Sequence, residues 1–436
     1  MDILSELKKR ILICDGGMGS LLQSAGLRPG ERPETWNLLH PEIVRGFHLD
    51  YLKAGADIIA ANTFGASCFH FPEGGEFGAL ELIAAGIRCA RSAVEEAGHG
   101  FAALDLGPSG KLLRPLGDLS FEDCVRGFSE VVREGVKAGA DLVLIETMSD
   151  LREVKAAVLA AKEQSSLPVM ATVTLDADGR LLTGGTVETV TALLEGLGVD
   201  ALGLNCSLDP VQMLPIARRF VEASKVPVII NPNAGLPRME EGKTVYDVGP
   251  EQFAQGMKEI MKLGVSIAGG CCGTTPAHIA LVAEAAKGFG APERQKKDAQ
   301  VICSAARLIT LGDAAVRTGE CLPAKDRDSL KEELLEGDYE SVVENALDLK
   351  DEGAEILLIE TGLKPEEESE VLPALIEELQ MAVDLPLAIR TDCPEAMEAA
   401  LRVSNGRPLV ERISESGDGR EALRRLAEKY GAVIRS

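Results

Sequence analysis

The 436-residue chain lacks any apolar run of about 18 residues, the length that a membrane-spanning helix needs. It has no basic segment followed by an apolar one at the amino terminus, so we expect no secretory signal. It also lacks an excess of Lys and Arg, since its formal net charge is −24. Because nucleic acids and anionic membrane surfaces are bound through basic side chains, the composition argues against both kinds of partner.

No pair of cysteines has the spacing Cys-x-x-Cys, which argues against a zinc ribbon or a thioredoxin-like redox site. Ten cysteines without regular spacing in a chain of this length indicate a reducing compartment, and we expect the protein in the cytoplasm. Charged residues make up 26% of the chain and hydrophobic residues 45%, as in ordinary soluble proteins. The length exceeds what one hydrophobic core usually supports, so two domains are expected.

Three cysteines stand at the ends of two apolar runs. Cys206 follows the run at 201–204, and Cys271 and Cys272 follow the run at 265–268 within a Gly-Gly-Cys-Cys-Gly sequence. Neighbouring side chains of a strand point to opposite faces, so both adjacent thiols reach one point only if the backbone bends, as the glycines allow. Three thiolates suit Zn²⁺ and leave its fourth tetrahedral position open. We therefore predict a zinc site that activates an external thiol as a thiolate.

The remaining cysteines and the histidines show no such grouping. Each of the other seven cysteines stands alone in a helical or strand-like pattern, where a small buried apolar side chain is expected. The histidines are expected at the surface or at helix caps: His40, His48, His70, His99 and His278.

Strand-like apolar runs alternate with amphipathic helical segments through the first 300 residues. Eight strands with intervening helices are typical of a (β/α)8 TIM barrel, and the length fits the ~250 residues of that fold. A doubly wound open sheet shows the same alternation, but its strand ends would not bring eight exits around one point. The predicted strands are 11–15, 57–62, 101–106, 141–146, 169–175, 201–205, 228–231 and 266–269, and predicted helices are 122–138, 151–163, 187–197, 210–223 and 252–263.

Polar or thiol groups follow the predicted strands. In a barrel these groups converge on the face at the carboxyl ends of the strands, where active sites lie. They are Asp15-Gly16-Gly17, Asn62-Thr63, Gly107-Pro108, Glu146-Thr147, Thr174, Asn205-Cys206, Asn231-Pro232-Asn233 and Cys271-Cys272.

A charged, helix-breaking stretch at 291–299 is typical of an interdomain linker. We expect residues 1–290 to form the barrel and residues 300–436 to form a smaller α/β domain about half a barrel long. Residues 301–436 carry 30 acidic and 16 basic side chains, which indicates either a well-solvated surface or an acidic docking face. The strands predicted there are 355–361, 386–391, 408–413 and 432–435, and the helices are 340–351, 366–382, 394–403 and 421–430.

Together these motifs resemble the homocysteine S-methyltransferase family, which includes the amino-terminal module of cobalamin-dependent methionine synthase and betaine–homocysteine methyltransferase. The resemblance covers residues 1–290. It implies that Cys206, Cys271 and Cys272 bind zinc, and that Asp15 and Glu146 hold the substrate ammonium, with the backbone of Gly16 and Gly17 near its carboxylate. The motifs that carry it are Asp15-Gly16-Gly17-Met18-Gly19, Asn62-Thr63-Phe64, Glu146-Thr147, Gly203-Leu204-Asn205-Cys206 and Gly269-Gly270-Cys271-Cys272-Gly273-Thr274.

An ammonium is a sensible partner for two acidic groups, although either acid could instead cap the helix after its strand. Thr147, Asn205 and Asn233 are further candidates for the substrate site. The two asparagines either hydrogen-bond the substrate or stabilise the backbone of their loops.

Residues 300–436 resemble the first half of the pterin-binding barrel that follows this module in methionine synthase. The similarity lies in segments such as 334–339 and 394–401. Where that family has its polar pterin-binding side chains, this chain has Leu358, Glu360, Arg390 and Glu411. We therefore expect no folate binding, and we expect this domain to serve packing or homodimer formation.

The resemblance implies zinc-dependent transfer of a methyl group to homocysteine, giving methionine, with no general base besides the metal. The Asp-x-His-x-x-Gly motif of cobalamin-binding modules is absent. We therefore expect methylcobalamin, carried by a separate corrinoid protein, as the donor. The alternatives are S-methylmethionine, S-adenosylmethionine or betaine as donor, and a non-catalytic zinc-binding, amino-acid-binding or corrinoid-pathway partner protein.

Overall fold

The computed structural model of the chain describes residues 2–240, 243–293, 300–312, 316–323, 327–411 and 418–435. It contains two compact units, Met1–Thr183 with Val199–Gln295, and Gly184–Gly198 with Lys296–Ser436. Most of the predicted linker, from residue 294 onward, lies outside the described residues. In the described parts of the chain, no helix has the length and apolar character needed to cross a membrane.

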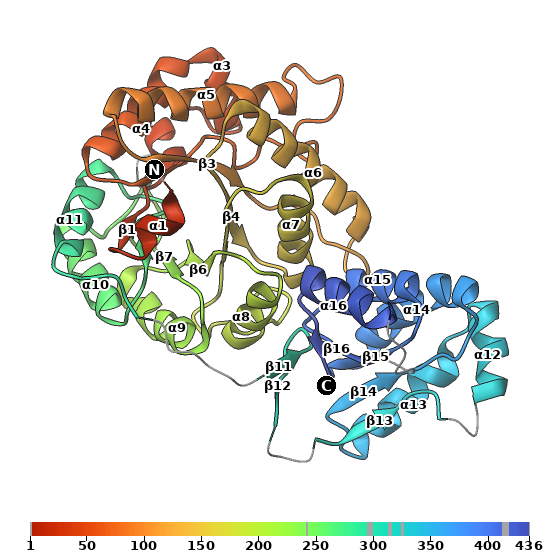
Figure 1. Cartoon of the computed structure of the whole chain (residues 1–436). Helices are drawn as coiled ribbons and strands as arrows, with labels where there is room; N and C mark the ends of the chain where they lie inside the picture. The colour runs from red at the N-terminus through yellow and green to blue at the C-terminus, as the bar shows by residue number, and fades with distance from the viewer. Residues whose placement is uncertain are drawn as a thin grey trace. The chain divides into compact units, whose positions relative to one another are not determined.

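Eight parallel strands form one sheet in the order β1-β10-β7-β6-β5-β4-β3-β2. A parallel bridge between Cys14 and Ile58 joins the two outer strands, so the sheet closes into a barrel (Figure 1). This closure confirms the predicted barrel. The strands are β1 (Leu12–Ile13), β2 (Ile58–Ala60), β3 (Phe101–Leu106), β4 (Leu142–Met148), β5 (Val169–Val173), β6 (Ala201–Asn205), β7 (Val228–Asn231) and β10 (Ile267–Ala268).

A long helix follows each barrel strand, and polar side chains or glycines mark where several of these helices begin and end. The side chains of Ser120 and Asp150 each accept a hydrogen bond from the backbone N–H three residues later, which satisfies a free donor of the first turn. Gly98 and Gly139 end helices with left-handed φ values of 73° and 97°. The helices are α4 (Pro41–Lys53), α5 (Ala79–Ala97), α6 (Phe121–Ala138), α7 (Leu151–Gln164), α8 (Val187–Gly196), α9 (Pro210–Ala223), α10 (Pro250–Lys262) and α11 (Pro276–Ala286).

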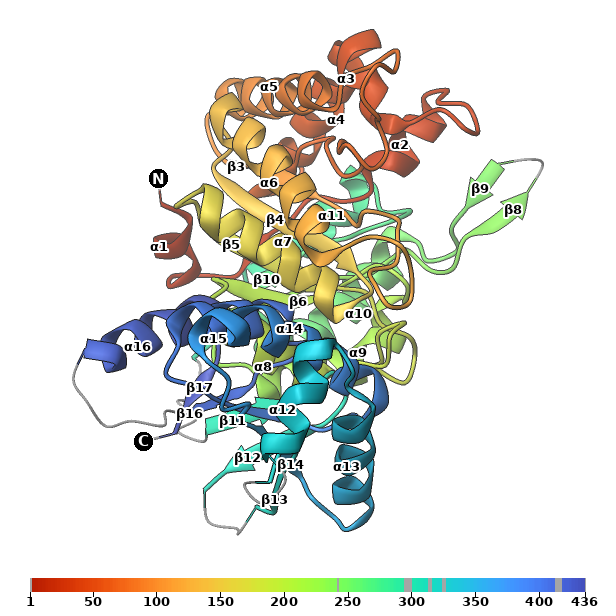
Figure 2. The same ribbon diagram turned by 90° about the vertical axis from the view of Figure 1, so that its right-hand side faces the viewer.

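Shorter elements were not predicted. The segment between β1 and α4 holds α2 (Met18–Ser24), a 3-10 helix η1 (Pro33–Thr35) and α3 (Trp36–Leu39). The antiparallel strands β8 (Arg238–Glu240) and β9 (Lys243–Val245) form a hairpin between β7 and α10 that projects from the barrel (Figure 2).

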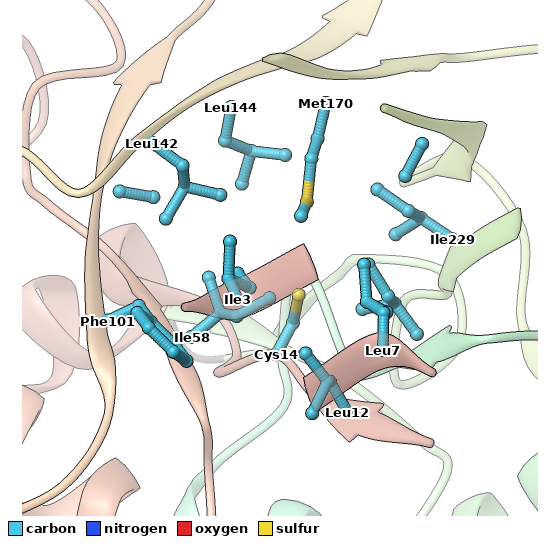
Figure 3. Close-up of a cluster of buried hydrophobic side chains, with 13 residues drawn as sticks. Ile3, Leu7, Leu12, Cys14, Ile58, Phe101, Leu142, Leu144, Met170 and Ile229 are labelled. Carbon is cyan, nitrogen blue, oxygen red and sulfur yellow. The ribbon is translucent and has the colours of Figure 1, made fainter. Parts of the chain in front are cut away.

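A short helix closes the amino-terminal end of the barrel core. In α1 (Ile3–Leu7), the side chain of Asp2 accepts hydrogen bonds from two backbone N–H groups of the first turn. Ile3 and Leu7 are buried against inward-facing strand residues such as Leu142 and Met170 (Figure 3). Burial of these side chains keeps water from the strand ends opposite the predicted site.

The second unit contains a parallel sheet in the order β13-β14-β15-β16-β17 and an antiparallel pair, β11 with β12. The strands of the parallel sheet follow sequence order, as strands of a barrel do, and among the described residues no pairing joins β13 to β17. The strands are β11 (Gln300–Cys303), β12 (Leu308–Leu311), β13 (Thr318–Glu320), β14 (Ile356–Ile359), β15 (Leu387–Arg390), β16 (Leu409–Glu411) and β17 (Val433–Ile434). Besides α8, which the division of the chain places in this unit, its helices are α12 (Arg327–Glu336), α13 (Glu340–Asp351), α14 (Pro365–Ala382), α15 (Pro394–Val403) and α16 (Asp418–Tyr430).

Two of the expectations about isolated residues are wrong. His48 is fully buried in α4, and neither ring nitrogen has a hydrogen-bond partner among the described residues. Burial lowers its pKa to about 3, so the ring is neutral. Cys68 is exposed, because it lies in the loop after β2 and not in a packed element. The other six isolated cysteines are buried, as expected.

Candidate active site and metal centre

The carboxyl ends of the barrel strands surround a cavity of about 220 Å³. Most of the predicted site residues line it: Asp15, Gly16, Gly17, Glu146, Thr147, Cys206, Cys271 and Cys272. Asn205 and Asn233 are buried beside these residues and are not part of the lining. Residues from six of the eight predicted strand exits therefore converge on the cavity, whereas Gly107-Pro108 and Thr174 are not in its lining.

The three predicted metal ligands lie together. The sulfur atoms of Cys206, Cys271 and Cys272 are within 4.8 Å of one another, and all three residues are half-buried. Sulfurs around a tetrahedral zinc ion with Zn–S bonds of about 2.3 Å lie about 3.8 Å apart, so this cluster fits one ion after small side-chain movements. Over the described ranges, no other group of three cysteine, histidine or acidic side chains is this close.

The thiols share hydrogen bonds. Donation from Cys271 and from Cys272 lowers the pKa of Cys206 to about 3. Donation to Cys206 raises the pKa of Cys272 to about 12 and also raises the pKa of Cys271, since further negative charge beside the first sulfur is unfavourable. Asn233 also hydrogen-bonds Cys206. One divalent cation suits this arrangement because it would replace the shared protons.

The backbone at the site is strained near the carboxyl ends of two strands, β4 and β6. Thr147, Cys206 and Ser207 have left-handed φ values of 62°, 63° and 56°, and no other non-glycine residue in the described ranges has a positive φ. Such conformations cost on the order of 1 kcal/mol each and persist where surrounding contacts hold them. Here Cys206 N–H donates to Asn231 O (3.0 Å), which anchors the turn after β6.

Close packing explains the glycines around Cys271 and Cys272. A Cβ on Gly270 would lie 2.4 Å from Oγ1 of Thr274. Gly273 has φ +80°, and a Cβ there would meet the ring of Tyr246 at 2.2 Å. Thr274 closes the turn, because its hydroxyl donates to Cys271 O (2.7 Å).

Asn205 connects three strand ends. Its Oδ1 accepts hydrogen bonds from Thr147 N (2.8 Å) and Thr172 Oγ1 (2.9 Å). Its Nδ2 donates to Thr147 Oγ1 (2.8 Å) and to the sulfur of Cys271 (3.8 Å). With both ends of the amide used inside the protein, the geometry favours backbone positioning, one of the two roles that the sequence left open.

Two carboxylates face the cavity with the thiols. Asp15 is buried, and its Oδ2 accepts from Ala60 N (2.9 Å). Glu146 is half-buried, and no hydrogen bond from a described residue contributes to the pKa of its carboxylate. Burial and the sulfur of Cys206 raise the pKa of Glu146 to about 7, and burial raises the pKa of Asp15. Among the described residues, no Lys, Arg or His lines the cavity, so it suits a positively charged group.

The profile of the homocysteine S-methyltransferase family matches residues 12–286, which is more than half of the chain. The chain belongs to this family. The matched range contains every predicted ligand and both carboxylates, so the family assignment and the geometry agree on the same end of the barrel.

Relatives and solved structures extend the comparison. The chain is 30% identical to methionine synthase of Mycobacterium tuberculosis and 29% identical to that of Mycobacterium leprae, each over 99% of this chain. It spans 38% of the length of those relatives. The homocysteine methyltransferase MmuM from Escherichia coli, in its metallated form, is 26% identical, with a TM-score of 0.55 over 64% of this chain and 96% of that one. Its oxidised form gives 26% identity and a TM-score of 0.54 over 62% and 94%.

Three residues at the site were not predicted from the sequence. Glu34 and Asp105 line the cavity, and Tyr246 hydrogen-bonds the sulfur of Cys272. Asp105 could have been identified from the sequence, since an acid inside the apolar run of β3 is unusual. Glu34 and Tyr246 come from connecting segments, where polar side chains are ordinary.

Proposed function

We propose that the chain catalyses zinc-dependent transfer of a methyl group to the thiol of homocysteine, giving methionine. The supporting observation is a cavity with three clustered sulfurs, two carboxylates at Asp15 and Glu146, and no basic side chain among its described lining residues. Homocysteine carries a thiol and an ammonium, which match the two halves of this cavity. Family membership supports the same substrate.

Cys206, Cys271 and Cys272 would hold the zinc ion, and their sulfur donor set suits it. Bound zinc would supply the positive charge that keeps a substrate thiol ionised near neutral pH. Asn205 and Asn233 orient the ligand set, because their side chains hydrogen-bond the sulfurs of Cys271 and Cys206.

Asp15 and Glu146 would hold the ammonium of homocysteine through charge-assisted hydrogen bonds. With this end fixed, the substrate sulfur points towards the three cysteines, and the methyl donor approaches from the open side of the cavity. Correct placement of both ends lowers the barrier because the reacting atoms no longer have to find each other. Thr147 adds to this wall of the cavity, where Asn205 fixes its backbone.

We propose methylcobalamin, carried by a separate corrinoid protein, as the methyl donor. The similarity to methionine synthases extends through the second unit, which supports this branch of the family. For the second unit we propose a role in docking or in a homodimer without folate binding, and we propose the cytoplasm as the location of the enzyme.

The test is methionine formation from homocysteine by the zinc-loaded chain. Methylcobalamin, S-adenosylmethionine, S-methylmethionine, betaine and methyltetrahydrofolate are compared as donors. Turnover with methylcobalamin supports the proposal. Turnover with a sulfonium or with betaine alone keeps the zinc chemistry and overturns the choice of donor. No product from any donor, including methylcobalamin bound to a corrinoid protein, would sink the proposed reaction.

A further inference from the structure

Two buried acids in the cavity have no role in the proposed reaction. Asp105, on β3, is 6% exposed, and its Oδ1 has no hydrogen-bond partner among the described residues. Glu34, in η1, is 4% exposed; its Oε1 accepts from Gly65 N (2.7 Å), but its Oε2 has no partner there either. Both line the cavity with Asp15 and Glu146.

Hydrogen bonds fix the backbone of Asp105, whereas Oδ1 of its carboxylate has no partner among the described residues. The hydroxyl of Thr63 donates to Asp105 O (2.8 Å), and Asp105 N donates to the same hydroxyl oxygen (3.1 Å). A buried carboxylate without a partner is costly, so a protein that keeps one facing a cavity normally pairs it with a ligand. Burial, with Glu146, Asp15 and Glu34 nearby, raises the pKa of Asp105.

The number of hydrogen-bond donors on an ammonium matches the number of lining acids near the strand ends. An ammonium has three N–H donors and satisfies them best with three acceptors. Asp15 has one carboxylate oxygen committed to Ala60 N, whereas the buried Oδ1 of Asp105 has no partner among the described residues. Asp15, Glu146 and Asp105 stand near the carboxyl ends of β1, β4 and β3 and line the same cavity, in which no described lining residue is basic.

We propose that Asp105 is a third carboxylate contact of the substrate ammonium, and that it makes a free amino group a requirement for tight binding. This inference rests on the proposed function, because it takes homocysteine as the ligand. Glu34 lines the same cavity, and its Oε2 has no hydrogen-bond partner among the described residues.

The experiment compares homocysteine with 4-mercaptobutyrate, the same thiol acid without the amino group, by calorimetric titration of the zinc-loaded full chain. Asp105→Asn keeps the size of the side chain and removes its charge. We expect this variant to bind homocysteine about 10- to 100-fold more weakly, as for a lost hydrogen bond to a charged group, with the affinity for 4-mercaptobutyrate unchanged. Asp118→Asn, at an exposed position outside the cavity, is the matched control and should match the wild type in both titrations.

In steady-state assays we expect KM for homocysteine to rise in Asp105→Asn with little change in kcat. Equal homocysteine affinity in wild type and variant would overturn the inference. Equal loss of both ligands would also overturn it, since that result indicates a general structural role. Failure of the proposed function looks different, because then the wild type itself would not bind homocysteine or would bind it without forming methionine.

Discussion

At the residue scale, Cys206 is the thiol that accepts hydrogen bonds from the other two. It accepts hydrogen bonds from Cys271, Cys272 and Asn233, and its own backbone is in the left-handed conformation. A serine at this position keeps the size of the side chain but not the soft sulfur donor that zinc prefers. We expect Cys206→Ser to bind zinc more than tenfold more weakly, as measured by chelator competition. Cys68→Ser, at an exposed position outside the cavity, should bind zinc like the wild type; equal affinities in the two variants would contradict the ligand assignment.

Glu146 predicts a pH dependence. Its pKa is raised to about 7, so the side chain is an anion above that pH and neutral below it. A neutral acid attracts an ammonium less, so binding should weaken as the pH falls. Methionine is the right probe because its thioether does not titrate. We expect its affinity to fall as the pH is lowered from 8 to 6, and Glu146→Gln to bind more weakly with a smaller pH dependence. A parallel pH profile in the variant would assign the titration to another group.

At the scale of elements, helix α1 contributes to stability although it is only five residues long. Leu7 is 7% exposed within the barrel core cluster, so its removal leaves a cavity below the strands. We expect Leu7→Ala to lower the free energy of unfolding by about 2–5 kcal/mol in urea titrations. Leu182→Ala, at a side chain 77% exposed, should change it by less than about 0.5 kcal/mol. Similar values for both would show that α1 is frayed in solution.

The elements also show what a sequence can indicate. The barrel strands were predictable because near-continuous apolar runs ending in polar residues are rare outside buried parallel sheets. Helix α1 was not, because five residues are too few for a helical period and its burial depends on strands distant in sequence. The cysteine cluster was predictable because the Gly-Gly-Cys-Cys-Gly motif and the preference of zinc for sulfur both point to it. The left-handed turn at Cys206 was not predictable, since the residue there is not glycine. The hydrogen-bond partners of Asn205 were not predictable either, because they depend on side-chain geometry.

At the scale of the whole molecule, the two units differ in whether the charged side chains at their strand ends are paired. The barrel leaves Glu146 and Asp105 open to a cavity. In the second unit, acids and bases at the strand ends satisfy each other: Arg390 donates to Glu360 (3.1 Å) and Glu411 (3.0 Å), and Arg435 donates to Glu411 (2.8 Å). Although Glu411 is buried, these hydrogen bonds keep its pKa below the usual value. Groups that are already paired have little to gain from a ligand.

This pairing leads to a prediction for folate. To bind a pterin at the ends of β14, β15 and β16, the second unit would have to break the ion pairs of Arg390 and leave Glu411 buried with fewer partners, which is strongly unfavourable. We expect no saturable heat when the full chain is titrated with methyltetrahydrofolate. A methionine titration of the same sample checks that the barrel is active in binding. Saturable folate binding that Arg390→Ala abolishes would place a pterin site on this unit and contradict the proposed role, whereas binding that Glu146→Gln abolishes would place the folate in the barrel cavity.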